Sequence, residues 1–174
     1  CGKCQFGDIS VVHTGNITNV DYLKAICNAL SPSVFQTETD TEIILHLIAK
    51  SEKETLDEAL IDAVSQLEGA FSFLLLSKDA FYAVRDKNEF RDLVIGHTKT
   101  SYVFASETVA LDAVGAECVR EVVAGEIVKI DLNNPELKTI ALNGDDTSLS
   151  HCAFESVYLG SPASNHMGSG NREV

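Results

Sequence analysis

The sequence predicts an α+β protein in which helices come first along the chain and an antiparallel sheet follows. Two observations lead to this fold class. Apolar residues recur at helical spacing in three segments before Gly69, and after Gly69 the chain changes to short runs rich in β-branched and aromatic residues. With 174 residues, of which 45% are hydrophobic, the chain is long enough for one domain with its own core.

Each of the three predicted helices begins with a threonine followed three positions later by an acidic residue, as in a capping box. These pairs are Thr18 with Asp21, Thr39 with Glu42, and Thr55 with Glu58. The apolar stripes that follow are Val20, Leu23, Cys27 and Leu30; Ile43, Ile44, Leu47 and Ile48; and Leu56, Leu60, Ala63, Val64 and Leu67. The second stripe is broad, which predicts a mostly buried helix.

Strands are predicted on both sides of this helical region. A first strand at 7–12 ends at His13, and residues 14–19 are turn and capping types that indicate a loop. Later strands are predicted at 70–76, 81–84, 93–95, 102–105, 118–122 and 126–132, with a hairpin turn at 77–79 and a short helix at 107–114. Their period-2 alternation is weak, so we expect the first four of them to form one sheet that is covered on at least one face.

Charge and composition exclude several classes of protein. A formal net charge of −13 argues against a nucleic-acid-binding surface. The chain shows neither an apolar stretch of about 18 residues nor a secretion signal, so we expect a cytoplasmic protein. The five cysteines are an odd number without a second close pair, which favours reduced thiols and predicts no metal site.

Several short strings occur in an order that matches one known family. They are HTGNITN at 13–19, TDTE at 39–42, RDKNEFRDL at 85–93, ASET at 105–108, REV at 120–122, GEI at 125–127 and CAFESVY at 152–158. Together they resemble the class II glutamine amidotransferases and, within that class, the amidophosphoribosyltransferases. The resemblance implies an N-terminal-nucleophile hydrolase fold with helices packed on antiparallel sheets (αββα), incomplete on the N-terminal side. It places this domain at residues 1–160 and leaves 161–174 as a flexible tail.

The resemblance also implies a set of site residues. Cys1 matches a nucleophile whose own α-amino group serves as general base in the family. Thr14 and Gly15 match the two donors that stabilise the oxyanion, although the family has an asparagine where Thr14 stands. Asn16 falls in the same loop as a substrate-binding residue, and Asp40 matches the acid that holds the α-amino group of glutamine. From residue type alone, Asp40 would instead cap its helix.

Departures from the family pattern, together with a second resemblance at 2–6, leave the role of Cys1 open. Only residues 3–6 separate the Cys-Gly start from the oxyanion loop, where the family has a long stretch that includes the arginine for the substrate carboxylate. The string at 2–6 also resembles a segment that precedes this loop, so Cys1 is either the nucleophile or an accidental chain start. Lys87, Glu89 and Asp92 stand where the family prefers proline, glycine and proline.

Two functions follow from these observations. The first is a glutaminase domain that releases ammonia from glutamine for phosphoribosylamine formation in purine synthesis, with a phosphoribosyltransferase domain as partner. The alternative is a noncatalytic fragment or paralogue that acts as a binding module. No cofactor is expected in this chain, because Cys152 resembles a ligand of an iron–sulfur cluster but a lone cysteine cannot hold one.

Overall fold

The structure is a computed structural model that describes residues 2–30, 35, 39–88, 90–142, 165–166 and 169–170. Cys1, the family-like string at 152–158 and most of the predicted tail at 161–174 lie outside the described residues. Within the tail, Asn165–His166 (β10) and Ser169–Gly170 (β11) pair as a short antiparallel ribbon.

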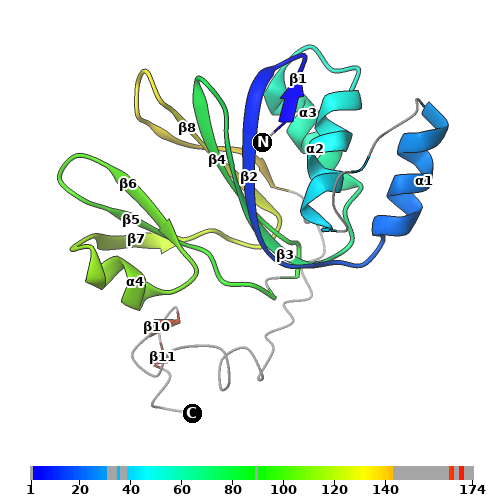
Figure 1. The fold of residues 1–174 in the computed structure, drawn as a ribbon. Helices are drawn as coiled ribbons and strands as arrows, with labels where there is room; N and C mark the ends of the chain where they lie inside the picture. The colour runs from blue at the N-terminus through cyan, green and yellow to red at the C-terminus, as the bar shows by residue number, and fades with distance from the viewer. Residues whose placement is uncertain are drawn as a thin grey trace.

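Four helices and two larger sheets make up the described part of the chain (Figure 1). The helices are α1 (Val20–Leu30), α2 (Thr41–Lys50), α3 (Leu56–Ser65) and α4 (Thr108–Ala113). The strands are β1 (Gly2–Cys4), β2 (Gly7–Ile17), β3 (Gly69–Leu76), β4 (Ala80–Arg85), β5 (Val94–His97), β6 (Tyr102–Ala105), β7 (Glu117–Glu121), β8 (Glu126–Asp131) and β9 (Leu137–Leu142). All three early helices and the late short helix were predicted, which confirms the α+β class.

The strands form two antiparallel sheets where the sequence predicted one. Strands β1, β2, β3, β4, β8 and β9 form a six-stranded sheet in that order, and β6, β5 and β7 form a separate three-stranded sheet. Hydrophobic pattern identifies a strand but not its neighbour, which explains the error. Strand β9 was not predicted, because its residues are only half-buried or exposed and give a weak strand pattern.

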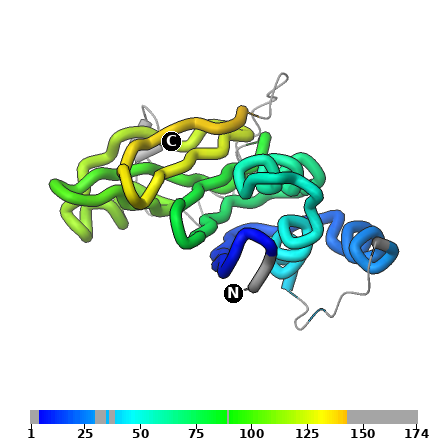
Figure 2. The backbone as a smooth tube through the Cα atoms, turned by 90° about the horizontal axis from the view of Figure 1, so that it is seen from above, coloured from blue at the N-terminus to red at the C-terminus, as the bar shows by residue number. Residues whose placement is uncertain are grey.

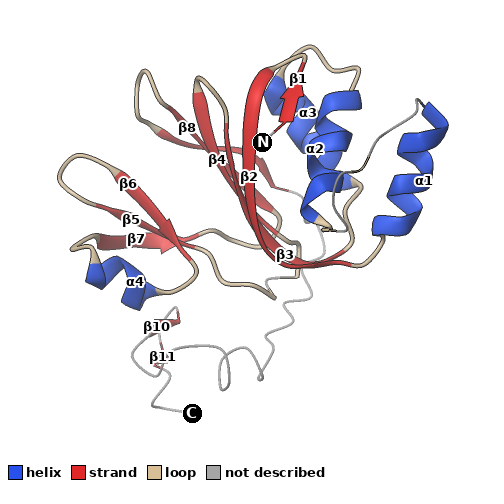
Figure 3. Ribbon diagram, in the orientation of Figure 1, coloured by secondary structure: helices blue, strands red, loops and turns tan. Residues whose placement is uncertain are grey.

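The faces of the six-stranded sheet pack against different layers. Phe71, Phe73 and Leu75 of β3 belong to the core shared with α1, α2 and α3. On the opposite face, Leu74 and Ala83 pack in a second core with residues of the three-stranded sheet. Because successive side chains of a strand point to opposite faces, β3 contributes to both cores. The outer face of the three-stranded sheet is covered by α4, which completes four layers and confirms the αββα arrangement (Figure 3).

The helical layer and the three-stranded sheet lie at opposite ends of the molecule. Figure 1 and the perpendicular view in Figure 2 both place α1 at one extreme and the β5, β6 and β7 sheet at the other. The six-stranded sheet therefore separates the two, and a side chain of β2 faces either the helices or the second sheet. No helix in the described part of the chain is both long and apolar enough to cross a membrane.

Strand β2 runs through the segment that was predicted as a loop. The prediction ended the strand at His13, whereas the structure continues it to Ile17, paired residue by residue with β3 down to Ile17 opposite Gly69. Thr14 and Asn16 are exposed residues of turn-favouring type, so composition alone indicated a loop. Tertiary pairing with β3 overrides that local preference.

Two glycines allow this pairing. Gly15 and Gly69 both have positive φ, at 113° and 133°. A Cβ on Gly15 would lie 2.1 Å from the carbonyl oxygen of Ala70, and a Cβ on Gly69 would lie 2.3 Å from that of Asn16. These contacts are too short for any side chain, so glycine is required at both positions for β2 and β3 to approach each other.

We predict that Gly69→Ala destabilises the protein by about 3 kcal/mol or more, because a clash with backbone adds to the strain of a positive φ. Urea unfolding followed by circular dichroism measures the change. Gly115→Ala is the matched control, since Gly115 also has positive φ but a Cβ there meets nothing within 4 Å. It should cost about 1–2 kcal/mol. Equal losses in the two variants would contradict the role of the close approach.

Candidate functional site

Asp40 stands at the start of α2 and directs its carboxylate at β2. It occupies the N-cap position of the helix, but its side chain makes no capping hydrogen bond. Instead, Oδ2 accepts a hydrogen bond from the backbone N–H of Ile17 at 3.0 Å, and Oδ1 lies 3.4 Å from Nδ1 of His13. The interpretation of Asp40 as a mere helix cap is therefore wrong, and the carboxylate is fixed beside the strand that carries the predicted oxyanion donors.

His13 is buried between β2 and the start of α2. Its side chain is 3% exposed, and Nδ1 is hydrogen-bonded to Oγ1 of Thr41 at 3.3 Å. Nε2 is buried without a hydrogen-bond partner among the described residues. Burial lowers the pKa of His13, with Asp40 acting against this shift and Arg91 adding to it. The ring is therefore neutral near pH 7.

Thr14 and Asn16 lie on one face of β2, and His13 lies on the other. Thr14 is paired with Ser72, and directly opposed residues project to the same face of a sheet. Ser72 donates a hydrogen bond to the carbonyl of Arg91 at 3.0 Å, on the side of the three-stranded sheet. Thr14 thus projects toward that sheet, and Asn16, two residues on, shares its face. His13 is opposite Phe73 and faces the helices.

A cavity of about 220 Å³ lies where Thr14 faces the second sheet. Polar groups of Thr14, Ser72, Asp92 and Ser106 contribute to its lining, and Phe104 and Leu93 supply apolar surface. Asp40 is not among its lining residues. The carboxylate of Asp40 thus lies beside Ile17 of β2, and Thr14 lines a cavity that Asp40 does not line.

Cys1 lies outside the described residues, but the position of its neighbour is known. Gly2 is paired with Ile9 in the β1–β2 hairpin. Gly15 follows Ile9 by six positions on β2, which is roughly 20 Å at the rise of a strand. Gly2 is therefore far from Gly15 along β2.

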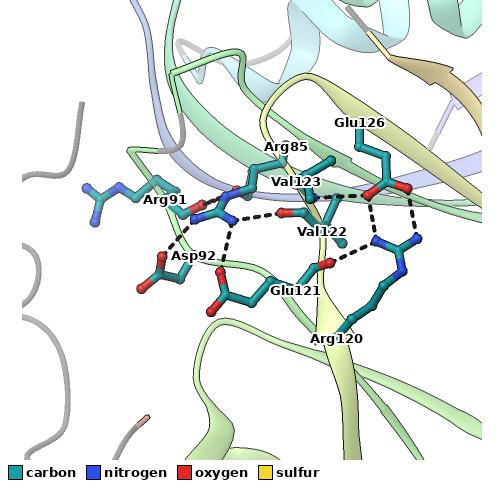
Figure 4. A network of polar contacts seen from close by, with 9 residues as sticks. Arg85, Arg91, Asp92, Arg120, Glu121, Val122, Val123 and Glu126 are labelled. Carbon is teal, nitrogen blue, oxygen red and sulfur yellow. Dashed lines mark hydrogen bonds and ion pairs between the residues drawn. The ribbon is translucent and has the colours of Figure 1, made fainter. Parts of the chain in front are cut away.

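Arg85 links the two sheets from a buried position at the end of β4 (Figure 4). Its side chain is 1% exposed. Nε donates to the carbonyl of Arg91 at 2.8 Å, Nη1 donates to the carbonyl of Val122 at 2.7 Å, and Nη2 donates to Oδ1 of Asp92 at 2.8 Å. Glu121 adds an ion pair at 3.4 Å. The guanidinium thus fixes the segment after β4 against β7, next to the cavity that Thr14 lines.

The partners of Arg85 come from the segment before β5 and from β7. Asp92 and Glu121 supply the carboxylates, and Arg91 contributes its backbone carbonyl. Asp86 instead accepts the N–H of Asn88 at 2.8 Å. Asp92, which stands where relatives were expected to have proline, thus gains an ion pair with Arg85. In the sequence, Asp92 was visible only as a departure from the family pattern.

A second buried carboxylate supports the same region. Glu126 at the start of β8 receives two hydrogen bonds from Arg120, at 2.7 and 2.8 Å, one from the N–H of Val123 at 3.0 Å and one from the hydroxyl of Thr139 at 2.5 Å (Figure 4). Burial raises the pKa of Glu126, but these donors outweigh it and lower the pKa below its ordinary value. Within the described residues, no group of three or more His, Cys, Asp or Glu side chains has the arrangement to hold a metal ion.

Comparison with known proteins places this arrangement in a family. The model of the glutamine amidotransferase domain family matches residues 3–113, which is more than half of the chain. This chain therefore belongs to the glutamine amidotransferase domain family. The matched residues contain Thr14, Gly15, Asn16 and Asp40 but not Cys1.

Within this family, the chain is similar to amidophosphoribosyltransferases. It is 40% identical over 163 residues to amidophosphoribosyltransferase 3, chloroplastic, of Arabidopsis thaliana, covering 93% of this chain and 30% of that protein. It is 37% identical to the amidophosphoribosyltransferase of Staphylococcus aureus strain MRSA252, covering 92% of this chain and 32% of that protein. The chain thus spans about a third of the length of these relatives.

Solved structures give the same result. The glutamine phosphoribosylpyrophosphate amidotransferase of B. subtilis, complexed with ADP and GMP, superposes with a TM-score of 0.85 at 35% sequence identity. That match covers 94% of this chain and 35% of the other. A glutamine aminotransferase class-II domain protein from Silicibacter pomeroyi has a TM-score of 0.54 at 16% identity, which shows a shared fold only. These matches confirm the predicted N-terminal-nucleophile hydrolase fold.

We predict that Arg85→Met lowers the free energy of unfolding by about 3–5 kcal/mol, because two carboxylates and two carbonyls then lose their buried donor. Guanidinium unfolding measured by fluorescence or circular dichroism tests this. Lys138→Met is the control, since Lys138 pairs with Glu136 on an exposed surface. It should change stability by less than about 1 kcal/mol. An Arg85→Met variant as stable as wild type would contradict the stabilising role of the Arg85 contacts.

We predict that His13 makes the protein less stable as the solution is acidified. The folded protein holds the pKa of His13 below its ordinary value of 6.5 by burial, so the unfolded chain takes up the proton first. The stability that the protein gains from this pKa difference is fully present above about pH 6.5. It is lost as the pH falls toward the pKa of His13 in the folded protein. The urea midpoint of wild type should therefore fall more steeply between pH 7 and pH 5 than that of His13→Leu. Parallel curves for the two proteins would contradict this assignment.

Proposed function

We propose that this chain is the glutamine-binding and glutamine-hydrolysing part of an amidophosphoribosyltransferase-like protein. The observation that carries the proposal is the direction of the Asp40 carboxylate. It is held beside β2 by the N–H of Ile17 and by His13 rather than used to cap α2. A fixed carboxylate at the edge of a strand is suited to receive the α-ammonium group of an amino acid.

Gly15 is the proposed oxyanion donor in the same site. Alternate residues of a strand direct their N–H groups to the same edge, and the N–H of Ile17 already points at Asp40. The N–H of Gly15, two residues earlier, is expected to face the same side. Glutamine bound through its α-ammonium group at Asp40 would then place its amide oxygen near Gly15. Asn16 and the hydroxyl of Thr14 remain proposed contributors, on the face toward the second sheet.

The chemistry follows from a thiol nucleophile. The sulfur of Cys1 attacks the side-chain amide carbon, while the α-amino group of Cys1, with a reference pKa near 8, takes up the thiol proton. The tetrahedral oxyanion is stabilised by fixed donors, and its collapse to a thioester expels ammonia, which carries the transferred proton. Water then attacks the thioester to release glutamate and regenerate the thiol.

The ammonia is proposed to serve a phosphoribosyltransferase domain, which would convert phosphoribosyl pyrophosphate to phosphoribosylamine. The support is that the similar proteins are named amidophosphoribosyltransferases and are about three times as long as this chain. The cytoplasmic location and the absence of a cofactor stay predictions. The Arabidopsis relatives are named as chloroplastic proteins.

A second candidate function is binding without hydrolysis. The pairing of Gly2 with Ile9 favours it, because this register leaves Gly2 six positions from Gly15 along β2, roughly 20 Å. In this case the chain would hold glutamine, or another ligand with an α-ammonium group, at Asp40 without a thiol at the amide carbon. The two candidates make different predictions for Cys1.

We predict that 6-diazo-5-oxo-L-norleucine, a reactive glutamine analogue, labels Cys1 stoichiometrically and that excess glutamine blocks the reaction. Mass spectrometry of the N-terminal peptide measures the label. Cys118 is exposed on β7 and serves as an internal control for nonspecific alkylation. No label at Cys1 would reject the hydrolase proposal and favour binding alone.

Asp40→Asn tests the binding site in both cases. Loss of a hydrogen bond to a charged group costs about 1.5–3 kcal/mol, so glutamine should bind at least about tenfold more weakly in a titration. Asp21→Asn removes an exposed carboxylate from the first turn of α1 and is the matched control. If Asp40→Asn binds glutamine as tightly as wild type does, Asp40 is not part of the binding site.

A further inference from the structure

His13 has no assigned part in the proposed chemistry, yet it contacts the residue on which that proposal depends. Its Nδ1 lies 3.4 Å from Oδ1 of Asp40 and is hydrogen-bonded to Oγ1 of Thr41 at 3.3 Å. The other carboxylate oxygen of Asp40 is held by the N–H of Ile17 at 3.0 Å. The carboxylate is therefore restrained at both oxygens, once by backbone and once by the imidazole.

The contact determines where the imidazole proton lies. A carboxylate 3.4 Å from Nδ1 repels a nitrogen lone pair and attracts an N–H, so the neutral ring carries its proton on Nδ1. Nε2 is then the unprotonated nitrogen, and it is buried with no hydrogen-bond partner among the described residues. A buried unpaired nitrogen costs stability. The contacts of His13 with Asp40 and Thr41 are made through Nδ1.

A neutral imidazole suits the contact between His13 and Asp40. The charged groups facing His13 are Asp40 at the start of α2 and Arg91 before β5, while β3 presents the uncharged Phe73. A protonated imidazole would neutralise Asp40 and compete with an incoming ammonium group. A neutral ring orients the carboxylate and leaves its negative charge available.

We propose that His13 is a positioning residue that holds the Asp40 carboxylate ready for the α-ammonium group of glutamine. This inference rests on the proposed function of Asp40. It predicts that loss of His13 weakens recognition of the ammonium group and leaves recognition of the rest of the ligand intact. A purely structural role would affect all ligands alike.

The test compares two ligands on the full chain by NMR titration. Glutaramate has the amide and carboxylate of glutamine but lacks the α-amino group. His13→Leu should bind glutamine about tenfold more weakly than wild type and should bind glutaramate unchanged. His13→Asn keeps an N–H donor near the place of Nδ1 and should recover most of the loss. His46→Leu removes a histidine of α2 that pairs with Glu42 and should leave both affinities unchanged.

The outcomes separate this inference from the proposed function. Wild-type affinity for glutamine in His13→Leu, or an equal loss for both ligands, overturns the positioning role while Asp40 keeps its place. Absence of glutamine binding by the wild-type chain overturns the proposed function and this inference together. Long-range nitrogen–proton spectra of the wild type should show the imidazole proton of His13 on Nδ1. A proton on Nε2 would contradict the proposed contact between Nδ1–H and the Asp40 carboxylate.

Discussion

The pairing of β2 with β3 is the contact on which the arrangement of the site depends. Eight consecutive residue pairs, from Ser10 with Leu76 to Ile17 with Gly69, fix the direction of every side chain on β2. The helix-facing positions bring His13 to α2, and the positions on the other face bring Thr14 to the second sheet. A shift of one residue in this register would exchange the two faces. Gly15 and Gly69 permit the register because a Cβ at either one would collide with the opposing backbone.

Two polar contacts then connect this strand to its surroundings. On the helix side, Asp40 accepts the edge N–H of Ile17, so the start of α2 is joined to β2 by a side chain that would otherwise cap the helix. On the other side, Ser72 and Arg85 both donate to the carbonyl of Arg91, which joins the six-stranded sheet to the segment before β5. The Asp40 carboxylate is partly exposed and the Arg85 guanidinium is buried. Both are charged groups with hydrogen-bonded partners, which makes the contacts sensitive to the loss of either member.

In the proposed site, Gly15 and Asp40 are separated from the side chain of Thr14 and from Gly2, the neighbour of Cys1. Thr14 projects to the opposite face of β2 from His13, and Gly2 lies opposite Ile9, far along β2 from Gly15. The proposed ammonium-binding and oxyanion positions thus share one edge of β2, and labelling tests whether Cys1 is the nucleophile.

Local sequence determined the helices and most of the strands, because apolar periodicity and capping residues act over a few positions. Thr55, for example, accepts the N–H of Glu58 as predicted. Ordered short strings also determined the family. Tertiary structure alone decided that there are two sheets, that residues 14–17 extend β2, that Asp92 and Glu121 are the partners of Arg85, and that Asp40 faces His13. Each of these depends on which distant segments meet. Pairing and burial between segments far apart in the chain leave no periodic signal, and here they outweigh local propensity.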